Sequence, residues 1–100
     1  MEGSVLIVTV IEARDLEAWE TVGTIDPFAI LECEGQKIQT GYVPNTKNPI
    51  WNEWFTFDIK RGDDPLIITI YDQGTILRFR HDFVGKFMLN LHSLGTQKEV

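Results

Sequence analysis

Hydrophobic and polar residues alternate along most of this chain with a period of two, which is the pattern of half-buried β-strands. The clearest alternation lies in residues 53–59. Its predicted inward residues are Phe55, Phe57 and Ile59, and its predicted outward residues are Trp54, Thr56 and Asp58. The pattern predicts strands over residues 5–11, 29–33, 37–43, 53–59, 66–71 and 83–91.

Turn residues separate these segments. Glu34-Gly35 reads as a tight turn that makes a hairpin of the two segments beside it, and Pro49 interrupts the strand pattern. No segment keeps a 3.6-residue period. Six or seven short strands in one domain of residues 1–100 predict an all-β, antiparallel β-sandwich.

Two predicted connections, residues 14–25 and 72–82, are too long for hairpins. Connections of this length in a compact domain are usually functional or disordered. The second one holds an aspartate near each end, and its middle reads "ILRFR" (76–80), which mixes large apolar side chains with arginines. A solvated loop does not need such apolar bulk, so this segment is a candidate contact site.

Composition narrows the class of protein. The 100 residues are 43% hydrophobic and 24% charged, as in globular chains, and the net charge of −6 argues against nucleic-acid binding. Eight acids and one base fall within residues 1–34, which also suits a solvated acidic face. We expect no signal peptide, because the first residues lack a basic segment.

No catalytic constellation stands out, and we expect that the chain is not an enzyme. The single cysteine, Cys33, occupies an inward strand position and is interpreted as a packed thiol in a reducing, cytoplasmic compartment. His81 and His92 show no metal-ligand spacing, and no nucleophile stands near the His81–Asp82 pair.

The order of several motifs resembles the C2 domain, a Greek-key β-sandwich module of membrane-targeting proteins. These motifs are "LIVTVIEARDL", "GTIDPFAIL", "NPIWNEWFTF", "IITIYD" and "HDFVGKF". The start at "VLIVTV" resembles the permuted, type II strand order. That family usually has eight strands, so the resemblance implies a shortened domain, an exchanged strand in a dimer, or an open sheet edge that invites another chain.

The resemblance also implies a calcium site, because C2 domains gather loop carboxylates around calcium, which then bridges to anionic lipid. The matching positions here are Glu20, Asp26, Asp72 and Asp82, enough for one ion with added carbonyls and water. Gly74 stands where the family usually has a bridging aspartate. The alternative is that Asp26 caps a turn while Asp72 and Asp82 terminate strands.

The tip of the second long connection carries the predicted lipid contact. In this fold such a tip points away from the sandwich, where apolar side chains and cations would meet an anionic membrane surface. The predicted contact residues are Trp19, Ile76, Leu77, Arg78, Phe79 and Arg80. The alternatives are that the apolar side chains pack on their own sandwich or contact a protein, and that the arginines bind phosphate without calcium.

The resulting hypothesis is a peripheral membrane-targeting module that binds anionic phospholipid, with calcium as an uncertain cofactor. One alternative is a calcium-independent protein-interaction domain that uses Trp54 or an open sheet edge. Another is a regulatory part of a larger enzyme. Outward-facing Trp54 is unusual and is covered either by a partner or by a neighbour such as Ile67.

Overall fold

The computed structural model describes residues 4–17, 25–74 and 82–91, and these contain six strands in two antiparallel sheets. The strands are β1 (Ser4–Glu12), β2 (Pro27–Cys33), β3 (Gln36–Gln39), β4 (Ile50–Ile59), β5 (Leu66–Asp72) and β6 (Asp82–Leu89). Each matches one of the predicted segments, so the antiparallel all-β prediction is confirmed. The described part contains no helix that is long and apolar enough to span a membrane.

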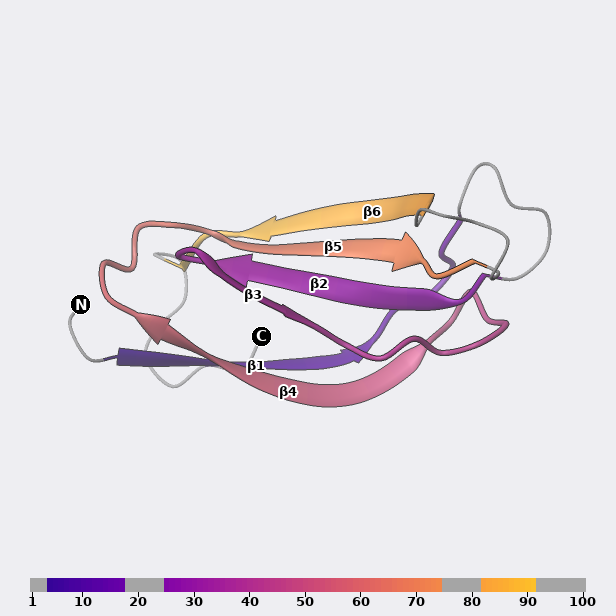
Figure 1. Cartoon of the computed structure of the whole chain (residues 1–100), viewed down its shortest axis with the longest axis horizontal. Coiled ribbons are helices and arrows are strands. Elements are labelled where there is room, and N and C mark those ends of the chain that lie inside the picture. The colour runs from indigo at the N-terminus through magenta and orange to yellow at the C-terminus, as the bar shows by residue number, and fades with distance from the viewer. Residues whose placement is uncertain (1–3, 18–24, 75–81, 92–100) are drawn as a thin grey trace.

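The two sheets form the two layers of a sandwich of unequal width. β1 and β4 make a two-stranded sheet, and the other sheet has the order β3-β2-β5-β6. Figure 1 shows the pair β1–β4 as one layer and β2, β3, β5 and β6 as the other. Non-sequential neighbours in both sheets give the crossing connections of a Greek-key sandwich.

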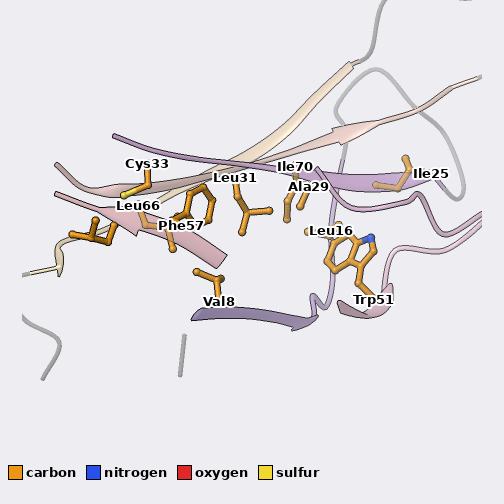
Figure 2. Close-up of a cluster of buried hydrophobic side chains, with 11 residues drawn as sticks. Val8, Leu16, Ile25, Ala29, Leu31, Cys33, Trp51, Phe57, Leu66 and Ile70 are labelled. Carbon is orange, nitrogen blue, oxygen red and sulfur yellow. The ribbon is translucent and has the colours of Figure 1, made fainter. Parts of the chain in front are cut away.

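The core lies between the layers and is built from alternate strand residues, as the sequence pattern predicts. Ala29, Leu31 and Cys33 of β2 are at most 2% exposed, and Phe57 of β4 is fully buried. Figure 2 shows these side chains facing Val8 of β1 across the space between the sheets. The period-two pattern therefore identified the core face of both layers correctly.

β4 begins three residues before the predicted start, because a bulge lets the chain continue beyond the proline. The register between β1 and β4 shifts between Val10 and Glu12, and Asn52 adopts a φ of 50° at this point. The left-handed turn at Asn52 allows Trp51 to be buried while Trp54 points outward. Trp54 is 67% exposed.

Two detailed expectations were wrong. The strand predicted over residues 37–43 ends at Gln39, because Thr40 Oγ1 accepts from the Ala29 amide and the Gly41 amide donates to Glu53 in the other sheet. Ile67 cannot cover Trp54, because Ile67 lies in β5 of the opposite layer, paired with residues of β2 and β6.

Candidate functional site

The two long connections open at the same end of the sandwich. The first ends at Asp26, directly before β2, and the second runs from the end of β5 to Asp82 at the start of β6. Pro27 pairs with Asp72, and Asp72 pairs with Asp82, so the three aspartates stand on neighbouring strand ends of one sheet. The register therefore brings three of the four predicted carboxylates to one place.

Asp72 connects the two connections through its side chain. It is only 3% exposed, and its Oδ1 accepts from the backbone amides of Asp26 and Gly74, each at 3.0 Å. The Gln73 amide returns a bond of 2.8 Å to the Asp26 carbonyl. A buried carboxylate that accepts two amides is stable as an anion, because these amides replace part of its lost hydration.

Asp26 is held by a second segment, the irregular stretch before β4. Its Oδ1 accepts from the Asn45 amide at 2.7 Å, and the Thr46 amide donates to the Ile25 carbonyl at 2.8 Å. The start of the first connection uses the same stretch, since the Leu16 amide donates to the Lys47 carbonyl at 3.0 Å. Both ends of this connection are therefore fixed on one support.

An aromatic row accompanies the aspartates, and the sequence reasoning missed it. Phe28, Tyr71 and Phe83 are register partners on β2, β5 and β6. The Phe28 and Tyr71 rings stack at 5.9 Å, and the Tyr71 and Phe83 rings meet edge to face at 6.2 Å. Phe28 is 2% exposed but Phe83 is 54% exposed, so the row ends in an accessible ring. The available signal was that each aspartate has an aromatic residue within two positions.

The described residues do not by themselves make a calcium site. Within the described ranges, no group of three histidine, cysteine, aspartate or glutamate side chains is arranged to hold a metal ion. One oxygen each of Asp26 and Asp72 is engaged by backbone amides. These positions also fit the structural roles considered above, a turn before β2 and the ends of β5 and β6.

The remaining predicted site residues lie outside the described residues. They are Trp19, Glu20, Ile76, Leu77, Arg78, Phe79 and Arg80, and they stay predictions. Both histidines also lie there.

Cys33 lies at the other end of β2 and takes no part in this site. It is 2% exposed within the core, so the prediction of a packed thiol is confirmed. Burial, with smaller contributions from Glu34 and Asp64, raises the pKa of its thiol. A thiol in this state is a poor nucleophile, because the thiolate is the reactive form.

Comparisons with known proteins agree with this geometry. The C2 domain family model matches residues 4–100. Synaptotagmin-5 of Arabidopsis thaliana is 33% identical over 98 residues, covering 95% of this chain and 17% of that protein. Human multiple C2 and transmembrane domain-containing protein 1 is 40% identical over 96 residues, covering 93% and 9% respectively. This chain thus spans less than a fifth of these curated relatives.

A solved structure supports the same assignment. The two calcium-bound C2 domains of extended synaptotagmin 2 align with a TM-score of 0.81 at 26% identity, over 92% of this chain and 36% of that one. The family match, the sequence relatives and the shared sandwich agree, and the chain belongs to the C2 domain family.

Proposed function

We propose that this C2 domain is a peripheral module that binds anionic phospholipid with the end of the sandwich where the two long connections open. The observation that supports it most is the shared position of Asp26, Asp72 and Asp82, which fixes both connections at one end. The "ILRFR" sequence of residues 76–80 begins four residues after Asp72 and therefore belongs to this end of the chain's topology.

The energies suit reversible binding. Burying Ile76, Leu77 or Phe79 in the membrane interface would contribute about 1–2 kcal/mol each. Arg78 and Arg80 would each add about 1 kcal/mol at an anionic leaflet. The exposed ring of Phe83, at the start of β6, offers a further apolar contact beside the connection. Such a sum gives attachment that is strong on anionic lipid and weak on neutral lipid.

Calcium is not required for this proposal. Arginine side chains can bind lipid phosphate directly through charge-assisted hydrogen bonds. Asp72 already uses one oxygen for two backbone amides, and Gly74 stands where a further aspartate would be needed. A relative has been solved calcium bound, so calcium is included as a variable in the test.

The test is co-sedimentation with vesicles of phosphatidylcholine, with and without phosphatidylserine, in calcium or in chelator. We expect binding to the phosphatidylserine vesicles in both conditions, and a loss of about tenfold or more in the double variant Arg78→Ala/Arg80→Ala. The matched control is Lys37→Ala/Lys60→Ala, which removes two cations from the opposite end of the sandwich. Absent binding, or an equal loss in both variants, would contradict the proposal.

A second candidate function is protein interaction, and the outer face of the β1–β4 sheet favours it. Five large apolar side chains on this face are at least 51% exposed: Val5, Ile7, Ile11, Ile50 and Trp54. No lysine or arginine lies among the described outward residues of these two strands, so this face does not suit anionic lipid. Failure of all vesicles to bind would leave this candidate ahead.

A further inference from the structure

The two layers of the sandwich are aligned along one side only. Gln36 of β3 and Asp58 of β4 exchange two hydrogen bonds, from Gln36 Nε2 to the Asp58 carbonyl at 2.7 Å and from the Asp58 amide to Gln36 Oε1 at 2.9 Å. The Gly41 amide donates to Glu53 Oε2 at 3.0 Å further along the same side. β4 therefore lies next to β3, and β1 is the next strand of its layer.

The opposite side of the wide sheet has no counterpart in the described chain. The order β3-β2-β5-β6 places β6 farthest from β4, whereas the other layer stops at β1. Figure 1 shows β6 on the side of the wide sheet away from β4. We call the space beside the second edge of β1 and facing β6 the open strand position.

Phe87 shows that this position is uncovered on the core side. It pairs with Ile68, whose neighbours on the same face, Leu66 and Ile70, are at most 3% exposed. Phe87 itself is 56% exposed although it occupies the core-facing register. A phenylalanine on the core face with half its surface in water indicates that one strand is missing from the opposite layer.

The edge of β1 lacks the features that protect natural sheet edges. Residues 5–11 contain no charge and no proline, and β1 is nine residues long with β4 as its only described partner. Natural edges usually carry lysine, proline or a covering segment. We propose that the open strand position takes one extended strand of another polypeptide, which pairs with β1 and covers Phe87.

The geometry favours a single strand over a second folded copy of this domain. A copy that paired through its own β1 would bring its own wide sheet, which already covers that β1. That sheet would occupy the space where β6 of the first copy lies. Two copies would also each carry a net charge of −6, which opposes association.

The chemistry of the partner strand follows from the residues around it. Its inward side chains must be apolar to pack on Phe87 and Leu89, and its outward ones lie beside Val5 and Ile7. The strand should be neutral or basic, because Glu12 ends β1 and the domain is acidic. A length of about seven to nine residues matches β1.

The probe is a synthetic peptide with residues 5–11 of β1 and a lysine at each end, Lys-Val-Leu-Ile-Val-Thr-Val-Ile-Lys. Paired antiparallel about Val8, it places valine opposite valine and its first lysine opposite Glu12. In hydrogen exchange on the whole chain, we expect alternate amides of β1 to exchange fast in the free protein and to be protected by the peptide. A peptide with a central proline should give no protection.

Two surface variants keep the test specific. Phe87→Lys places a charge over the open strand position and should weaken peptide binding by about tenfold or more. Met88→Lys is the control, because Met88 is 65% exposed on the opposite face of the same strand and should leave binding unchanged. The proposal is overturned if the peptide does not bind, if it protects β3 or β6 instead, if β1 is already fully protected in the free chain, or if both variants behave alike.

Discussion

The backbone amide of Asp26 donates a 3.0 Å hydrogen bond to Oδ1 of Asp72, 46 residues further along the chain. This bond joins the end of the first long connection to the start of the second. The Gly74 amide shares the same oxygen. Asp72 therefore has a structural task at the loop end whether or not it ever meets a metal ion.

Replacing Asp72 separates its charge from its role as a hydrogen-bond acceptor. Asp72→Ala leaves two amides without their acceptor at a site that is 3% exposed, and it should lower the free energy of unfolding by about 1–3 kcal/mol. Asp72→Asn keeps an acceptor oxygen and should lose less. Urea denaturation measures both, and equal stability of Asp72→Ala and the wild type would contradict this role.

Glu34 should make stability depend on acid pH. Its carboxylate accepts from the backbone amides of Gly62, Lys60 and Arg61, and these bonds lower its pKa below the ordinary value of 4.5. A lowered pKa in the folded state means that the contribution is present above the unfolded pKa and is lost as the pH falls through the folded one.

The corresponding experiment compares Glu34→Gln with the wild type between about pH 6 and pH 3. The variant should be less stable near pH 6, and the difference should shrink towards pH 3. Glu32→Gln is the control, because it removes an equal charge from a side chain whose ion pair with Lys37 is long, at 4.0 Å. A difference that does not change with pH would show that the backbone bonds of Glu34 do not depend on its charge.

Asn52 is the residue that lets β4 continue past Pro49. A φ of 50° is unfavourable for most side chains, and least so for glycine and asparagine. Asn52→Val should cost about 1–2 kcal/mol of unfolding free energy, whereas Asn52→Gly should stay close to the wild type. Thermal or urea denaturation checks this, and a valine variant as stable as the glycine variant would refute it.

The strands were predictable from the sequence because side-chain alternation records which face is buried. In β2 the buried residues Ala29, Leu31 and Cys33 alternate with the more accessible Ile30 and Glu32, so the pattern alone located the core face. Register was harder to predict, because it depends on pairs far apart in the chain. The pairing of Asp72 with Asp82 became visible only in the folded sheet.

Local backbone irregularities explain what the pattern missed. The bulge at Asn52 and the side-chain bond of Thr40 to β2 both break the period of two, which moved one strand start and one strand end. The aromatic row of Phe28, Tyr71 and Phe83 depends on cross-strand register in the same way.

Trp51 and Trp54 are three residues apart and should behave in opposite ways. Trp51 is 9% exposed in the core, so Trp51→Ala should cost about 3–5 kcal/mol, a large part of the stability of a domain this size. Trp54 is 67% exposed, and Trp54→Ala should change stability by less than about 0.5 kcal/mol.

Trp51→Phe provides a variant that folds if the alanine variant does not. The indole Nε1 of Trp51 is buried without a hydrogen-bond partner in the structure, so phenylalanine removes no bond and should cost less than alanine. Urea denaturation of the three variants gives the order. Similar losses for Trp51→Ala and Trp54→Ala would mean that the bulge does not separate the two rings as described.

Thermal melting in calcium against chelator tests the metal part of the site. A site with a Kd of about 10 µM would add about 2.7 kcal/mol at about 1 mM calcium, which is more than about 10 °C for a chain of this length. We expect a shift below about 3 °C, because the described aspartates form no three-ligand group and two of their oxygens are held by backbone amides. A larger shift that disappears in Glu20→Gln and in Asp72→Asn would instead establish a calcium site formed by the first and second connections together. Magnesium at the same concentration is the control, since a general salt effect would move the midpoint equally with either ion.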